Sequence, residues 1–210
     1  VTPSSASGIF SGMSSAFKIN GDLMTEPIIE DIALIMNLGG NKDSRASTIM
    51  SLEDSFEVSR RFAMKRSSIM RGDDFDFGDY SIRDLEAIQR LLKQEIPLVV
   101  RANRASDLLR MIEIAKQYQI RIIFAGAKEA WRIADSIAEE SIPVIIDPMD
   151  NIPSSFDSIA ARLDNAAILE DSGVKVLISS QSDHNSYLSR QGAGNAVTYG
   201  LSKEAAIKAL

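Results

Sequence analysis

The fold is decided by a stretch that begins Pro97-Leu-Val-Val-Arg-Ala-Asn-Arg-Ala-Ser-Asp107 and continues, after a helical run, with Ile120-Arg-Ile-Ile-Phe-Ala-Gly126. A second helical run leads to Pro143-Val-Ile-Ile-Asp147, so that three apolar segments begin at equal intervals, at residues 97, 120 and 143. A strand, a helix and two short loops need about this number of residues. Apolar strands that alternate with helices are typical of a parallel sheet covered on both faces. The stretch therefore predicts an α/β fold.

Further elements are expected on both sides of this stretch. Towards the N-terminus the pattern predicts a short strand over 14–20, a helix over 26–38, a helix that opens at Ser51, an exposed acidic loop over 71–79 and a helix over 81–95. Towards the C-terminus it predicts helices over 107–119, 128–140, 155–171 (broken near Asp164) and 192–199, a strand over 174–179, and a last helix capped by Ser202. Capping residues and glycines place most of these boundaries.

Strand–helix alternation fits either a Rossmann-type sheet or a barrel of eight β/α units. Four or five strands are too few for a complete barrel, which needs ~250 residues, so we expect a partial one. A Rossmann-type binding domain would instead require a strand order that reverses. In both architectures ligands meet the carboxyl ends of the strands, expected at 101–104, 125–128, 147–151 and 179–185.

Composition limits the classes of partner. The net charge is −6, which argues against a nucleic-acid partner, and no apolar run approaches the ~20 residues of a membrane span. The chain has no cysteine and one histidine, His184, so it cannot build a metal site from several imidazoles by itself. Because it begins with Val1 and ends inside an amphipathic pattern at Leu210, we expect an internal fragment of a longer protein. Residues 1–210 are predicted to form a single fragment, with 81–210 as its consecutive β/α units and 1–80 as its N-terminal part.

Several motifs occur in an order and spacing that resemble one enzyme family. They are Val99–Asp107, Gly126-Ala-Lys-Glu-Ala-Trp131, Asp171-Ser-Gly-Val-Lys-Val176 and Gly200–Leu210. Together they resemble the amidohydrolase superfamily, in its imidazolonepropionase-related and prolidase-like branches. The resemblance implies a partial (β/α)8 TIM barrel of the metal-dependent hydrolase type, with its first strands missing. It also implies hydrolysis of C–N bonds other than peptide bonds, by a water that zinc or another divalent ion activates.

The positions at which the family carries its metal ligands are occupied differently here. The resemblance aligns two histidines with Arg101 and with Gly126 or a neighbour, and the aspartate of the last strand with Gln181. A guanidinium repels a cation, glycine has no side chain, and glutamine is a weak neutral ligand. Shifting the last alignment by two residues brings in Asp183, with His184 beside it, and these two are the candidate catalytic residues. We therefore expect no metal or other cofactor in this fragment, while the resemblance allows zinc or another divalent ion in a longer parent.

Two functions stay open at this point. The chain is a fragment of an imidazolonepropionase-related hydrolase, or it is an inactive pseudo-amidohydrolase that binds a small molecule or a protein. Arg101, Asn103, Arg104 and Gln181 are predicted to bind the ligand, although a structural ion pair is the alternative for the arginines. We expect a small-molecule partner, no nucleic acid and no membrane, and a homo-oligomer formed through exposed barrel edges.

Overall fold

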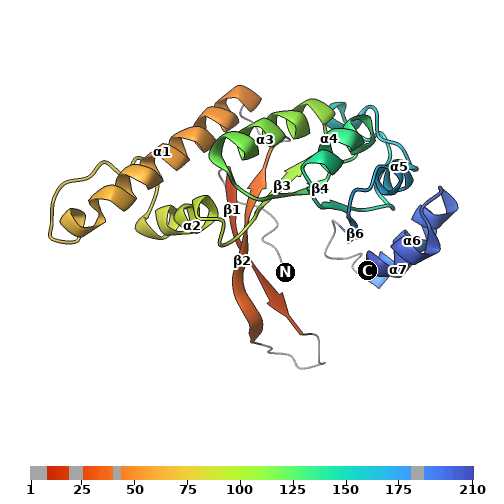
Figure 1. Cartoon of the computed structure of the whole chain (residues 1–210), viewed down its shortest axis with the longest axis horizontal. Coiled ribbons are helices and arrows are strands. Elements are labelled where there is room, and N and C mark those ends of the chain that lie inside the picture. The colour runs from red at the N-terminus through yellow and green to blue at the C-terminus, as the bar shows by residue number, and fades with distance from the viewer. Residues whose placement is uncertain (1–8, 19–25, 40–43, 181–186) are drawn as a thin grey trace. The chain divides into compact units, whose positions relative to one another are not determined.

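The computed structural model describes residues 9–18, 26–39, 44–180 and 187–210. The chain divides into two compact units, and Figure 1 labels the helices and strands of which they consist. Unit 1 comprises residues 1–98 and 118–121, and unit 2 comprises residues 99–117 and 122–210.

Unit 1 is built from an antiparallel hairpin and two helices. Its elements are β1 (Phe10–Phe17), β2 (Pro27–Asn37), α1 (Arg45–Ile69) and α2 (Ile82–Leu92). In the hairpin Met13 pairs with Leu34, and the register shifts at several points along β1. The inner half of β2, residues 33–36, is buried, whereas Ile28 and Ile29 in its outer half are exposed. The hairpin therefore contributes to the core through only half of its length.

The helix expected over 26–38 is wrong, because these residues form β2. The apolar positions of this segment fit a helical face, but its isoleucines also favour a strand, and pairing with β1 decides between the two. The helix expected to open at Ser51 begins six residues earlier, at Arg45, because Ser44 already supplies the cap: its Oγ accepts from the Ser47 N–H at 3.1 Å.

The helix expected from residue 81 is confirmed as α2, where Ser81 and Asp84 form a capping box. It packs against α1, and Ser59 Oγ donates to the Leu85 carbonyl at 2.9 Å. The expected loop over 71–79 is irregular, as predicted, but two of its aromatic side chains contact Phe62, with ring centroids 6.0 and 6.1 Å apart.

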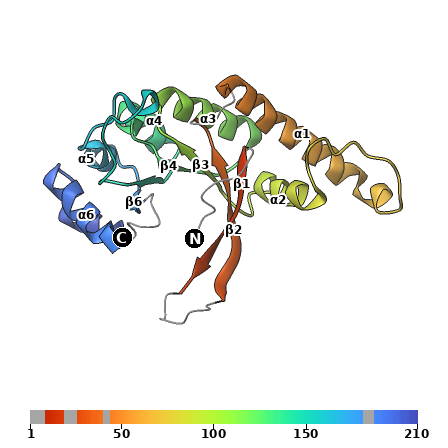
Figure 2. The ribbon, with the colours of Figure 1, turned by 180° about the vertical axis from the view of Figure 1, so that it is seen from behind.

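Unit 2 contains the alternating strands and helices that the sequence predicts, except that the helix expected over 155–171 is only a 3-10 turn followed, from residue 165, by a short helix. Its elements are β3 (Leu98–Ala102), α3 (Ala105–Tyr118), β4 (Ile122–Gly126), the 3-10 helix η1 (Ala130–Ile133), α4 (Ala134–Glu139), β5 (Val144–Ile146), the 3-10 helix η2 (Phe156–Ser158), α5 (Asn165–Asp171), β6 (Val176–Ile178), α6 (Ser189–Thr198) and α7 (Lys203–Lys208). In Figures 1 and 2 the helices α3 and α4 cover the same side of β3 and β4.

The strands of unit 2 follow one another in chain order, β3-β4-β5-β6. The β4–β5 and β5–β6 pairs are parallel; Phe124 faces Val144, which faces Val176. A Rossmann-type sheet would require the strand order to reverse, and within these four strands it does not. The core between strands and helices consists of buried apolar side chains, among them Val100, Leu108, Met111, Phe124, Ile137, Val144 and Leu169. Within the described residues no helix is long and apolar enough to span a membrane.

Candidate functional site

The carboxyl ends of the strands in unit 2 gather the polar residues that the sequence places there. The strands end at residues 102, 126, 146 and 178, which confirms the expected ends within a residue or two. Among the described residues of the predicted site, Asn103 and Arg104 lie in these loops and Arg101 lies within β3. In a parallel sheet these ends lie along one edge, where ligands bind.

The end of β3 carries three of the predicted ligand-binding residues. Arg101 lies in the strand and is partly buried, and Asn103 and Arg104 follow it directly. Arg104 Nη2 donates to the Phe156 carbonyl at 3.0 Å and lies 3.5 Å from a carboxylate oxygen of Asp157. Arg104 therefore holds the loop after β5 in place. This is the structural ion pair that the sequence left open as the alternative to ligand binding.

The end of β4 is shaped by Gly126 and by the residue that follows it. Gly126 has φ of +85° and Ala127 has φ of +46°, both in the left-handed region. The turn is held by the Ala127 N–H, which donates to the Ala102 carbonyl at 2.8 Å. A Cβ atom at Gly126 would lie 2.7 Å from Asn103 Oδ1, closer than such contacts allow. The Asn103 carboxamide thus fills the space that a side chain at position 126 would need.

Two buried polar residues that the sequence does not single out fix these loops. Glu129 accepts hydrogen bonds from the N–H groups of Ala105 at 3.1 Å and Ala160 at 3.0 Å. Asn165 donates to the Ala127 carbonyl at 3.1 Å and accepts from the Trp131 N–H at 2.8 Å. Both residues join loops that are far apart in the sequence, so no local pattern marks them. Their effect is to hold the ends of β3 and β4 in fixed positions.

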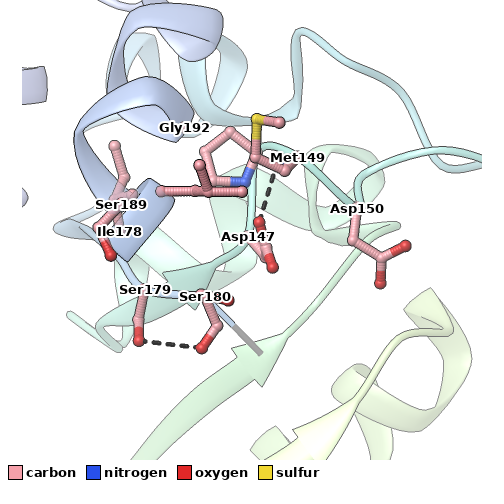
Figure 3. Close-up of a pocket in the computed structure, with 10 residues that line it drawn as sticks. Asp147, Met149, Asp150, Ile178, Ser179, Ser180, Ser189 and Gly192 are labelled. Carbon is pink, nitrogen blue, oxygen red and sulfur yellow. Dashed lines mark hydrogen bonds between the residues drawn. The ribbon is translucent and has the colours of Figure 1, made fainter. Parts of the chain in front are cut away.

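A pocket of about 440 Å³ lies at the ends of β5 and β6 (Figure 3). It is lined by Asp147, Pro148, Met149, Asp150, Ile178, Ser179, Ser180, Leu188, Ser189 and Gly192. Asp147 Oδ1 accepts from the Met149 N–H at 3.0 Å, which fixes the start of the loop. Asp150 pairs with Lys128 Nζ at 2.8 Å. The described lining residues thus offer carboxylates and hydroxyls together with apolar side chains.

The two described residues at the expected metal positions do not fit a metal ion. Arg101 is a cation, and Gly126 has no side chain. Gln181, Asp183 and His184 lie outside the described residues, so the candidate catalytic pair stays a prediction. Among the described residues no group of three or more histidine, aspartate or glutamate side chains is placed to hold a metal ion.

Comparison with known proteins gives one informative likeness. No protein-family model matches the chain, and no curated protein matches it. The structure is similar to the crystal structure of an amidohydrolase from Thermotoga maritima MSB8, with a TM-score of 0.85 and 21% sequence identity. The match covers 98% of this chain and 57% of that chain. At this identity the likeness shows the fold: the chain has the α/β fold of part of that amidohydrolase, which confirms the α/β part of the predicted fold class.

Proposed function

We propose that the chain forms part of a (β/α)8 barrel of the amidohydrolase kind and binds a small polar molecule at the carboxyl ends of its strands, without a metal ion. The expectation that no metal ion binds rests on the structure of the chain at the end of β4. A histidine at position 126 would require a left-handed backbone that side chains disfavour, and the end of the Asn103 side chain would have to turn away, since its Oδ1 lies 2.7 Å from the place of a Cβ atom. This end of the sheet is built around a glycine and a carboxamide, which suits binding of a polar ligand better than ligation of a metal.

The size and lining of the strand-end pocket support a small-molecule partner. Its volume of about 440 Å³ lies in the range of sites for small ligands, roughly 300–1,000 Å³. Ile178 and Leu188 supply apolar surface, while Asp147 and Ser180 supply hydrogen-bonding groups. Such a mixture is typical of sites that orient a small molecule through a few polar contacts.

A second candidate function is hydrolysis of C–N bonds other than peptide bonds, of the imidazolonepropionase-related type. The fold likeness to an amidohydrolase favours it. Because this chain spans 57% of that protein, such an activity belongs to a longer parent that supplies zinc or another divalent ion from other residues. Asp183 and His184 are the residues of this chain that would serve it.

Elemental analysis of the full-length parent separates the two candidates. The parent is purified from cells grown with added zinc and manganese, beside its Asp183→Ala/His184→Ala variant. The proposal expects far less than one ion per chain in both proteins. One ion per chain in the parent would contradict the proposal and favour the hydrolase, and its loss in the variant would assign the ligands to Asp183 and His184.

We also propose that the chain self-associates through an open strand edge. In unit 2 the strand order ends at β6, which has one neighbouring strand among the described strands, and on its other edge the Ile178 N–H already donates to the Ala209 carbonyl at 2.8 Å. The part of that edge left for a second chain is the backbone of Val176. An unpaired strand edge is a template for pairing with another chain. Sedimentation over a range of concentrations tests this, and a monodisperse monomer throughout would contradict it.

A further inference from the structure

Asn151, in the loop after β5, is buried, and one end of its carboxamide has no partner. The residue is 2% exposed, and its Nδ2 donates to the Arg162 carbonyl. Its Oδ1 is buried and accepts from no donor among the described residues. Exchanging the two ends of the carboxamide would bring Oδ1 against the Arg162 carbonyl oxygen, so this hydrogen bond fixes which end is left over. A buried carbonyl oxygen without a donor costs free energy, which a molecule that brings an N–H or O–H group would recover.

Asn151 also lines a shallow pocket of about 360 Å³ in unit 2. No residue that lines this pocket also lines the strand-end pocket. Ile152 and Tyr199, which are 46% and 45% exposed, supply hydrophobic surface. The other lining residues are Pro153, Ala161, Arg162, Leu163 and Asp164. The pocket therefore joins apolar surface to the residue whose buried oxygen lacks a donor, and its volume lies within the range of sites for small ligands, roughly 300–1,000 Å³.

The two charged side chains of the lining neutralise each other. Arg162 Nε and Nη2 donate to the two carboxylate oxygens of Asp164, at 2.8 and 2.5 Å. The Arg162 guanidinium also lies over the Trp131 ring, 4.6 Å from its centroid. An ionic ligand would have to disturb this arrangement to form an ion pair at an exposed position, where such pairs contribute little. The pocket therefore favours an uncharged ligand.

We propose that this pocket is a second binding site of the chain, which takes a small uncharged aromatic molecule that carries one O–H or N–H donor, as phenols and indoles do. The donor pairs with Asn151 Oδ1, and the ring lies against Ile152, Pro153 and Tyr199. Two aromatic rings attract each other in offset or edge-to-face arrangements, which suits a ring beside Tyr199. The site shares no residue with the strand-end pocket, so it is independent of the proposed function.

Binding requires a small movement of the loop, because the chain covers Asn151 Oδ1. The two residues after Asn151 are exposed, so their side chains are free to turn. The loop is anchored on both sides of them: the Met149 N–H donates to Asp147 Oδ1 at 3.0 Å, and the Ser154 N–H donates to Ser158 Oγ at 3.3 Å. We therefore expect the movement to be confined to residues 150–153.

The test uses the whole chain, labelled with 15N, and three aromatic probes. Phenol has an O–H donor, anisole has the same ring and oxygen without the donor, and benzoate carries a negative charge. We expect phenol to shift the side-chain NH₂ signals of Asn151 and the backbone amides of Ile152 and residues 161–164. Phenol should bind at least tenfold more tightly than anisole or benzoate, because only phenol is both uncharged and able to donate to the buried oxygen.

Variants of exposed residues test the pocket without disturbing the core. Tyr199→Ala and Ile152→Ala should each weaken phenol binding about fivefold or more, since each removes apolar surface that the ring would bury. Tyr187 and Ile159 supply the matched controls, because both are exposed and neither lines this pocket or the strand-end pocket. Tyr187→Ala and Ile159→Ala should leave phenol binding unchanged. Equal weakening by a variant and its control would overturn the inference.

The role of Asn151 is tested by the preference for phenol over anisole. Asn151→Ala should bind the two probes equally, and its thermal melt shows whether it is folded; the Tyr199 and Ile152 variants keep the test decisive if it is not. If the parent protein binds anisole as tightly as phenol, the pairing with Asn151 Oδ1 is wrong. If benzoate binds more tightly than phenol, the ligand class is wrong. If no probe shifts the amides around Asn151, there is no second site, and its Oδ1 pairs with water alone.

Discussion

The contact between Gly126 and Asn103 gives a prediction about stability whose size follows from the structure. An alanine in the left-handed region costs roughly 1 kcal/mol or somewhat more. Gly173 lies in that region with φ of +84°, against +85° for Gly126. Gly173→Ala should therefore lower the free energy of unfolding by about 1 kcal/mol, since a Cβ atom there meets nothing within 4 Å. Gly126→Ala has the same backbone cost, and its new Cβ atom must also push away Asn103 Oδ1, which lies 2.7 Å from the position of that Cβ atom. Turning the carboxamide out of its rotamer adds about 1 kcal/mol, which brings the total to about 2 kcal/mol.

A double-mutant cycle isolates the contact. In an Asn103→Ala background the atom that meets the new methyl group is gone, so Gly126→Ala should cost only about 1 kcal/mol, as Gly173→Ala does. The coupling energy between positions 103 and 126 is then about 1 kcal/mol. Urea unfolding of the four proteins, followed by circular dichroism and by the amide signals of unit 2, measures it. Both glycines lie in unit 2, so the same transition reports on each. A coupling below about 0.3 kcal/mol would refute the reasoning.

Three further substitutions test other contacts. Glu129→Gln should destabilise unit 2 by about 2 kcal/mol and lower its thermal midpoint, because the new NH₂ group faces one of the two backbone N–H donors that the carboxylate accepts from. The control is Glu113→Gln, which removes the charge of an exposed ion pair and should change the thermal midpoint little. The hydroxyl and the N–H of Ser202 both donate to the Glu170 carboxylate, and these hydrogen bonds lower the pKa of that carboxyl below its ordinary 4.5. The stability that they contribute is therefore present above about pH 4.5 and is lost as the pH falls through the folded-state pKa of Glu170. Ser202→Ala should cost about 1 kcal/mol at pH 7 and less in acid, in urea unfolding at several pH values. Burial raises the pKa of Tyr80 above 10.0, so the contribution of its neutral phenol to stability is present below pH 10 and is lost as the pH rises through the folded-state pKa. In thermal melts at alkaline pH the Tyr80→Phe variant should therefore lose less stability than the parent protein. An equal loss in both proteins would contradict this.

The strands of unit 2 were predictable because their sequences carry two agreeing signals. Runs of branched apolar residues, as in Val144–Ile146, are bounded by turn formers, and the first three of them begin at equal intervals, at residues 97, 120 and 143. The β2 strand carried conflicting signals. Its apolar positions repeat at helical spacing while its isoleucines favour a strand. The deciding contact is with β1, from the pair Phe17 and Pro27 to the pair Phe10 and Met36, and the pattern of β2 alone does not show it.

The candidate site was predictable in its location but not in its construction. The strand ends, with Asn103 among them, follow from the alternation of strands and helices. The roles of Glu129 and Asn165 do not, because each depends on loops that only the folded chain brings together. A single sequence shows a glutamate and an asparagine like any others on the surface.

Gly126 and Asn103 are linked by one contact. A histidine at position 126 would need a side chain in a left-handed backbone, and the Asn103 carboxamide would have to turn away. The backbone of Asn103 would stay in place, because its carbonyl and that of Ala102 accept from the N–H groups of Glu129 and Ala127. The turn after β4 and the carboxamide after β3 are thus coupled through one side chain. Sequences that keep a glycine at this turn should therefore keep a small polar residue, and not a large one, at the position of Asn103.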